Sequence, residues 1–203
     1  MLILASASNA RHRLLQQARI PHKVIVSHFN ENTIKKKNSI DLAQSLAQAK
    51  AEKVASTLSK KNDGKQINSN TLAILGCDSV FEFNGKSLGK PKSKEESLKR
   101  LLLMSGKSGF LHTGHTLILK KNRHDNVLNK VKNSVISTHI KFEDFTSEEI
   151  ELYVNSEETI SCAGGFTLEG EGSKFITSIN GCYSNVIGIS LPWLRKNIYK
   201  ENI

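Results

Sequence analysis

Apolar residues recur along this 203-residue chain in short runs typical of strands and in wider repeats typical of helices. The first run, Leu2 to Leu4, predicts a strand that ends at the polar residues 6–8. A helical repeat follows almost at once, with Leu14 and Leu15 as its first buried positions. The chain therefore predicts a strand that turns directly into a helix.

The rest of the chain mixes both patterns. Asn84-Gly85 between two short apolar runs predicts a tight hairpin. Ser93 with Glu96, and Thr146 with Glu149, predict capping boxes at two helix starts. Polar connections are expected at 61–70 and 120–126. Helices are expected at 39–58, 93–104, 146–154 and from about 190, and strands at 23–26, 71–75, 80–83, 86–88, 111–119 and 127–142. This mixture predicts an α/β fold with a mixed sheet, in a single domain over residues 1–203.

The chain carries a net charge of +10, which favours anionic partners. The lysine runs at 35–37, 60–61 and 120–121 lie in polar segments without interleaved aromatic residues. Solvated surface explains these runs better than a nucleic-acid patch, which would need stacking platforms. A small polyanion such as a nucleotide is equally consistent with basic residues in a cleft.

Cysteine usage and hydropathy restrict the setting of the protein. Cys77, Cys162 and Cys182 are odd in number, far apart and without a CxxC pair, so neither a disulfide framework nor a zinc site is expected. We expect reduced thiols in a cytoplasmic protein. No run of 18 apolar residues and no signal-peptide pattern is present, so no membrane partner is expected.

The strand-to-helix junction is the first candidate site. It exposes unpaired N–H groups and the positive end of the helix dipole, and Ser6, Ser8 and Arg11 lie beside it. These groups together suit an oxyanion or a phosphate. An N-capped helix with a solvated basic face explains the same residues equally well.

Three further candidate site residues are the acidic Asp78 and the basic Lys50 and Lys90. Asp78 comes after an apolar run and Gly76, so we expect it at the carboxyl end of a buried strand, where it could hold Mg²⁺ or accept a proton from water. A capping aspartate in a turn is the alternative. Lys50 lies on the apolar face of its helix and needs an anion or a path to water. Lys90, between Gly89 and Pro91, suits a phosphate but also fits an exposed loop.

Two further acidic residues are weaker candidates. Glu31 precedes the long helix and also fits an ordinary exposed glutamate. Glu169 lies in the glycine-rich stretch 162–172, which matches neither the dinucleotide fingerprint nor the P-loop. Its carboxylate could accept hydrogen bonds from the N–H groups of a base, and a tight loop is the alternative explanation.

The order of these motifs resembles the Maf family of nucleoside triphosphate pyrophosphatases. The matching segments cover Leu2 to Leu194: LILASAS with Arg11, LAQAKAEKVA, ILGCDS, LGKP, MSG, Thr113-Gly114, Tyr153-Val154, CAGGFTLEGEG and NVIGISL. The resemblance implies a mixed, curved sheet flanked by helices, with two lobes and a central cleft, of the Maf/inosine-triphosphatase type. It also implies a hydrolase that converts (d)NTPs to the monophosphate and pyrophosphate, in house-cleaning of nucleotide pools, with Mg²⁺ or Mn²⁺.

The resemblance also assigns roles. Asp78 matches the family's general base and is a candidate metal ligand, Glu31 matches an acidic cleft residue, and Glu169 occupies a position that is Gln in one branch and Glu in another. The positions that match the phosphate end of the cleft are Ser6, Ser8, Arg11, Lys50 and Lys90. A nucleoside triphosphate and a second copy of the chain are the implied partners.

The chain departs from the family at its N-terminal motif. Asn9 replaces a proline and Ala10 replaces the first of two arginines. The missing arginine and the CAG…EG pattern are closer to the branch that acts on 7-methyl-GTP. The alternative function is a catalytically weak Maf-fold protein that binds nucleic acid or regulates cell division.

Overall fold

The computed structural model describes residues 1–61, 73–120 and 128–198. Within these residues seven strands form one mixed sheet in the order β2-β1-β3-β5-β6-β7, and β4 also pairs with β3. The strands are β1 (Leu2–Leu4), β2 (His22–Val24), β3 (Ala73–Phe83), β4 (Lys86–Leu88), β5 (Ser108–Lys120), β6 (Leu128–Phe142) and β7 (Ile176–Asn180). β2, β1 and β3 are parallel, and the remaining pairs are antiparallel.

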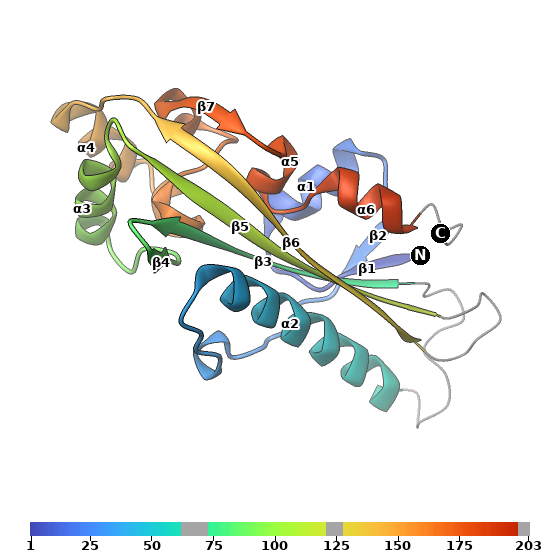
Figure 1. Ribbon diagram of the computed structural model, residues 1–203. Coiled ribbons are helices and arrows are strands. Elements are labelled where there is room, and N and C mark those ends of the chain that lie inside the picture. The colour runs from blue at the N-terminus through green and yellow to red at the C-terminus, as the bar shows by residue number, and fades with distance from the viewer. Residues whose placement is uncertain (62–72, 121–127, 199–203) are drawn as a thin grey trace.

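Helices cover both faces of the sheet (Figure 1). α2 lies alone on one face, α1, α5 and α6 lie on the other, and α3 and α4 pack together at one end. The α-helices are α1 (Asn9–Gln17), α2 (Ser39–Lys61), α3 (Lys94–Met104), α4 (Ser147–Asn155), α5 (Tyr183–Ile187) and α6 (Leu191–Ile198). Short 3₁₀ helices are η1 (Glu31–Thr33), η2 (Glu158–Ser161), η3 (Ala163–Gly165) and η4 (Glu171–Phe175). None of the helices in these ranges has the length and apolar composition to cross a membrane.

Two glycines let α2 approach the sheet closely. A Cβ added to Gly76 of β3 would lie 2.2 Å from the carbonyl oxygen of Ala47, and one added to Gly114 of β5 would lie 2.2 Å from that of Ala43. The backbone of α2 therefore occupies the space of two missing side chains. This close packing fixes the height of α2 over β3, on which the candidate site depends.

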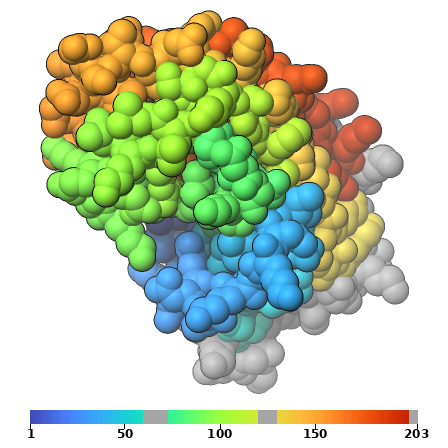
Figure 2. Space-filling model, turned by 60° about the vertical axis from the view of Figure 1, so that its left-hand side comes forward, coloured from blue at the N-terminus to red at the C-terminus, as the bar shows by residue number. Residues whose placement is uncertain are grey.

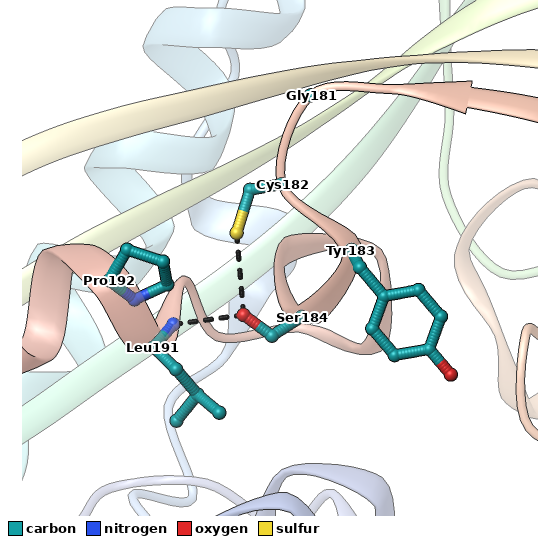
Figure 3. A pocket seen from close by; sticks show the side chains of 6 residues that line it. All are labelled: Gly181, Cys182, Tyr183, Ser184, Leu191 and Pro192. Carbon is teal, nitrogen blue, oxygen red and sulfur yellow. Dashed lines mark hydrogen bonds between the residues drawn. The ribbon is translucent and has the colours of Figure 1, made fainter.

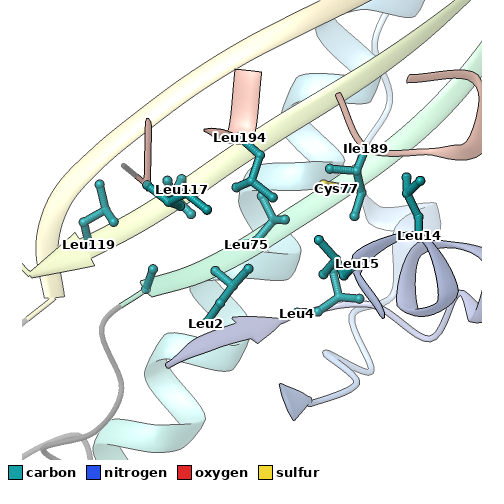
Figure 4. Packing of buried hydrophobic residues seen from close by; sticks show 12 residues of the cluster. Leu2, Leu4, Leu14, Leu15, Leu75, Cys77, Leu117, Leu119, Ile189 and Leu194 are labelled. Atoms are coloured by element: carbon teal, nitrogen blue, oxygen red, sulfur yellow. The ribbon is translucent and has the colours of Figure 1, made fainter. Parts of the chain in front are cut away.

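The alternation of side chains along β1 divides the core between the two faces. Leu2 and Leu4 point toward α1 and α6, whereas Ile3 and Ala5 point toward α2. Figure 4 shows the first cluster, in which the labelled residues are Leu2, Leu4, Leu14, Leu15, Leu75, Cys77, Leu117, Leu119, Ile189 and Leu194. A further cluster, centred on Phe81, Phe142 and Tyr153, fills the α3–α4 end.

The α/β fold with a mixed sheet and most of the expected elements are confirmed. Asn84 and Gly85 have φ of 49° and 71° and form the predicted hairpin turn. Thr146 and Glu149 form the predicted capping box. Ser93 caps α3 by accepting from the Glu96 N–H, but the box is incomplete, because the Glu96 carboxylate binds the N–H at position 92 instead.

One expected boundary is wrong. The apolar run before Gly76 and the run after Ser79 are one continuous strand, so Asp78 lies in the middle of β3 rather than at its end. The glycine marks the contact with α2, not a turn. The expected connections at 61–70 and 120–126, apart from Lys61 and Lys120, fall outside the described residues, as do the first two residues of the strand expected at 71–75.

Candidate active site

The site lies at a gap in the strand pairing of β3. On the side of β3 away from β5, β1 pairs with Ala73–Leu75 and β4 pairs with Phe81–Phe83. Residues 76–80 therefore have a strand neighbour on one side only. We call this stretch, between the end of β1 and the end of β4, the notch. Asp78 and Ser79 occupy its centre and point to opposite faces of the sheet.

On the α2 face, Lys50 joins two carboxylates. Its Nζ lies 2.5 Å from Oδ1 of Asp78 and 2.8 Å from Oε1 of Glu31. Lys50 and Asp78 are only 9% and 7% exposed, whereas the Glu31 side chain is 54% exposed. The predicted inward-facing lysine thus meets its anion, and Glu31, which begins η1, extends the pair toward solvent.

The electrostatics of Asp78 reflect this setting. Burial raises the pKa of Asp78 above its usual value, and the nearby Glu31 raises it further. The positive charges of Lys50 and Arg11 oppose this rise without cancelling it. The result is a carboxylate that binds a proton more readily than an exposed aspartate does, which suits a general base.

On the opposite face, Arg11 is buried without a carboxylate partner among the described residues. Its Nε donates to the carbonyl of Gly188 at 3.0 Å, Nη1 donates to Oγ of Ser6 at 3.1 Å, and Nη2 donates to Oγ of Ser79 at 2.9 Å. All three acceptors are neutral. A buried guanidinium with only neutral acceptors keeps an uncompensated positive charge, which favours an anion at this place.

The two serines of the N-terminal motif have different tasks. Ser8 is the N-cap of α1, and its Oγ accepts from the N–H of Arg11 at 3.4 Å. Ser6 is buried and accepts from both Arg11 and the N–H of Ser8. The structure therefore supports the N-cap interpretation for Ser8, and it assigns Ser6 to holding the arginine in place.

Lys90 is not brought into contact with the Lys50–Asp78 pair. It is exposed and lies two residues beyond β4. Since β4 runs antiparallel to β3, with Leu88 opposite Phe81, the chain leaves β4 in the direction of the notch. Lys90 is therefore placed at the notch by chain direction rather than by a contact.

Glu169 is held by an ion pair from α1. Oε2 of Glu169 lies 3.2 Å from Nη2 of Arg13, and the backbone N–H of Glu169 donates to Thr167 at 3.1 Å. The glycine-rich segment is thereby tied to the same helix that carries Arg11. No sequence signal predicted Arg13, because its partner lies 156 positions away.

Ser79 and Thr113 lie in the matching motifs but were given no role in the predicted site. Ser79 Oγ bonds both Arg11 and Thr113 Oγ1, and Thr113 in turn donates to the carbonyl of Asn185. Strand alternation after Asp78 could have placed Ser79 on the arginine side. The position of Thr113 follows only from the register between β3 and β5.

A shallow depression lies around α5 and the start of α6 (Figure 3). Ser184 Oγ contacts the thiol of Cys182 at 3.3 Å and accepts from the N–H of Leu191 at 3.0 Å. The depression is lined by Gly181, Cys182, Tyr183, Ser184, Leu191 and Pro192, and none of these is a predicted site residue. Cys77, Cys162 and Cys182 are all free thiols, as expected.

Fold and site together define an α/β enzyme with a buried, lysine-paired carboxylate and a buried arginine whose side-chain acceptors are all neutral. The model of the Maf-like protein family matches residues 1–201. A nucleoside triphosphate pyrophosphatase of Prochlorococcus marinus strain SARG is 48% identical over 100% of this chain and 98% of its own length. Another, from Synechococcus sp. strain CC9605, is 47% identical over 95% and 98%, respectively. The chain therefore belongs to the Maf family of nucleoside triphosphate pyrophosphatases.

Proposed function

We propose that the chain hydrolyses nucleoside triphosphates between the α- and β-phosphates, and that the notch is its active site. The observation that carries this proposal is the buried Lys50–Asp78 pair next to Arg11, which lacks a carboxylate partner in the described part of the chain. The family membership and the names of the relatives, which are nucleoside triphosphate pyrophosphatases, support the same reaction.

The cations around the notch would hold the triphosphate. Arg11 comes from α1, Lys50 from α2 and Lys90 from the loop after β4, so each cation belongs to a different element that borders the notch. Figure 2 shows a hollow between the blue segment before α2 and the green segments around β4 and α3, with deeper blue residues inside it. We assign the central cleft between two lobes to this hollow. Cations spread along its walls would neutralise a polyphosphate.

Asp78 acts as the general base in this proposal. Its carboxylate takes a proton from the water that attacks the α-phosphorus, and the bond to the β-phosphate oxygen breaks to release pyrophosphate. The raised pKa of Asp78 makes it a better proton acceptor than an ordinary aspartate. Lys50 holds Oδ1, so the carboxylate keeps one orientation while the charge on the phosphoryl oxygens develops.

The oxygen donors present fit a Mg²⁺ or Mn²⁺ ion that arrives with the substrate. Such an ion is bound by one or two carboxylates plus substrate phosphates. Asp78 and Glu31 supply two carboxylates, and the described ranges hold no group of three or more acidic, histidine or cysteine ligands. The recorded contacts of Asp78 and Glu31 use only Oδ1 and Oε1, respectively. The bound ion would neutralise charge on the transferring phosphoryl group.

Glu169 is the proposed reader of the base. A carboxylate only accepts hydrogen bonds, so it favours a base edge that presents N–H groups, as guanine does. A methyl group on N7 adds positive charge to the base, which a carboxylate also favours. Arg13 fixes Oε2 of Glu169 and thereby its direction. These features and the missing first arginine at Ala10 support 7-methyl-GTP as a preferred substrate.

A substrate panel tests the proposal. The purified protein is incubated with Mg²⁺ and GTP, 7-methyl-GTP, dTTP or UTP, and pyrophosphate, orthophosphate and monophosphate are measured separately. We expect equal amounts of pyrophosphate and monophosphate, with 7-methyl-GTP fastest. Release of orthophosphate would contradict cleavage at the α-phosphate. No turnover of any triphosphate, together with salt-sensitive binding of RNA or DNA, would favour the alternative of a nucleic-acid-binding protein.

A further inference from the structure

One ion pair on α3 holds the loop that carries Lys90. Glu96 and Arg100 are one helical turn apart and form a salt bridge. Nη1 of Arg100 donates to the carbonyl of Gly89 at 2.6 Å, and Oε2 of Glu96 accepts from the N–H of Lys92 at 2.8 Å. The backbone is therefore fastened on both sides of Lys90 by the same pair.

Two more contacts restrain this loop from the glycine-rich segment. The N–H of Gly164 donates to the carbonyl of Gly89 at 3.2 Å, so this oxygen accepts from two elements. Pro91 is buried, and a Cβ added to Gly165 would lie 3.1 Å from its ring. The backbone around Lys90 is thus fixed while the side chain of Lys90 stays exposed.

The loop lies where the proposed substrate would bind. β4 runs back along β3, and Leu88 stands opposite Phe81, one residue beyond the notch. The chain enters residues 89–92 from there. The end of β1, with Ser6, bounds the notch from the other side. Lys90 therefore starts from a fixed backbone position at the border of the notch.

We propose that the Glu96–Arg100 pair is a positioning device that presents Lys90 to the triphosphate. The inference rests on the proposed function. An exposed lysine on a loose loop would lose conformational freedom when it binds a phosphate, and this loss weakens binding. A loop fastened at both ends has lost most of that freedom beforehand. The N–H of Lys92 and the guanidinium of Arg100 also hold the pKa of Glu96 below its usual range, so the pair stays charged at neutral pH.

The first experiment removes the guanidinium. Arg100→Met keeps the length of the side chain and loses the bonds to Gly89 and Glu96. We expect kcat/KM for the preferred triphosphate to fall about tenfold, mostly through KM, because substrate binding then has to order the loop. Arg100→Lys should restore part of the loss. Lys99→Met, on the neighbouring exposed position of α3, is the matched control and should stay within about twofold of the unmodified chain.

The second experiment asks whether the pair acts through Lys90. We expect Lys90→Met to lower kcat/KM, and Arg100→Met to add nothing further in the Lys90→Met background, because residues that act as a unit are not additive. Additive losses would overturn the proposal. A loss with Lys90→Met and none with Arg100→Met would also overturn it while leaving the proposed function intact. An unchanged Lys90→Met enzyme would remove Lys90 from the substrate site and the positioning role with it.

A third measurement does not depend on activity. Hydrogen exchange at the amide of Lys92 should speed up in Arg100→Met and in Glu96→Gln, since this amide donates to the Glu96 carboxylate. Glu96→Gln keeps the shape of the side chain and provides the same test if Arg100→Met folds poorly. Exchange at Lys92 that stays unchanged in both variants would show that the pair does not hold the loop.

Discussion

At the scale of single residues, the site depends on how one buried carboxylate is kept available. Asp78 without Lys50 would be an uncompensated buried charge, which proteins tolerate poorly. Lys50 opposes but does not cancel the effect of burial, which is the main cause that raises the pKa of Asp78. Glu31 shares the same lysine at 2.8 Å and raises the pKa of Asp78. The three-membered arrangement therefore keeps Asp78 both charged and basic.

The general-base role makes a direct prediction for Asp78→Asn. The amide keeps the size of the side chain but cannot accept the proton from water. We expect kcat, measured as pyrophosphate release, to fall at least about 100-fold. Circular dichroism should show an unchanged fold. Turnover close to that of the unmodified chain would exclude Asp78 as the base.

The neighbours of Asp78 predict opposite changes in the pH profile. The base works only when deprotonated, so activity is lost as pH falls through the pKa of Asp78, which lies above that of an exposed aspartate. Lys50→Met removes a positive neighbour, and the acid limb of kcat/KM should move to higher pH. Glu31→Gln removes a negative neighbour, and the same limb should move to lower pH. Equal shifts in one direction would contradict this account.

At the scale of elements, short sequence patterns correctly predicted the turns and helix caps that depend only on neighbouring residues. The hairpin at Asn84-Gly85 and the cap at Thr146 follow from short-range backbone geometry, and both are confirmed. The strand break expected near Gly76 is wrong. A glycine is needed there because α2 packs closely against it, and not because the backbone turns. Glycine alone cannot distinguish a turn from a close contact.

The candidate site was predictable to the same extent. Helical spacing placed Lys50 on the inward face, and an apolar strand led to Asp78, but the ion pair between them is seen only in the structure. The order of the motifs identified Arg11 as a site residue. That its hydrogen-bond acceptors are all neutral could be learned only from the structure. The pairing of Arg13 with Glu169 depends on how α1 packs against the glycine-rich segment. A short sequence pattern cannot predict this packing.

The packing of α2 predicts a cost for filling Gly114. The new Cβ of Gly114→Ala would lie 2.2 Å from the carbonyl oxygen of Ala43, a backbone atom that cannot turn aside. We expect the free energy of unfolding, measured with urea, to fall by about 1–3 kcal/mol, as in other overpacked cores. Gly89→Ala is the control, since its Cβ would meet nothing within 4 Å. Equal stability of the two variants would contradict the close approach of α2.

At the scale of the whole molecule, the notch is the place where site residues from both faces of the sheet contact neighbouring positions of β3. Lys50 and Asp78 belong to the α2 face and Arg11 to the α1 face, and an intact sheet would keep them apart. β1 ends after Leu4, while β3 continues to Phe83, so residues 76–80 lack a strand neighbour along one edge. A net charge of +10 adds long-range attraction for an anionic substrate.

The free energy of unfolding should depend on pH because of one buried histidine. His115 of β5 is fully buried, and its Nε2 accepts from the N–H of Ser190 at 2.8 Å, at the start of α6. Burial, with a smaller contribution from Arg11, lowers the pKa of His115 to about 4. The unfolded chain binds this proton near pH 6.5, so between these values the unfolded state binds more protons. Stability must therefore fall as the pH drops.

The expected loss from His115 is about 2 kcal/mol in the free energy of unfolding between about pH 7.5 and about pH 5. Urea unfolding at both pH values measures it. His115→Gln lacks the titrating group and should lose correspondingly less between the same two pH values. His28→Asn removes a histidine at a φ of 48°, which asparagine tolerates, and should keep the full loss. If His115→Gln and the unmodified chain lose the same amount, the acid sensitivity does not come from the contact between β5 and α6.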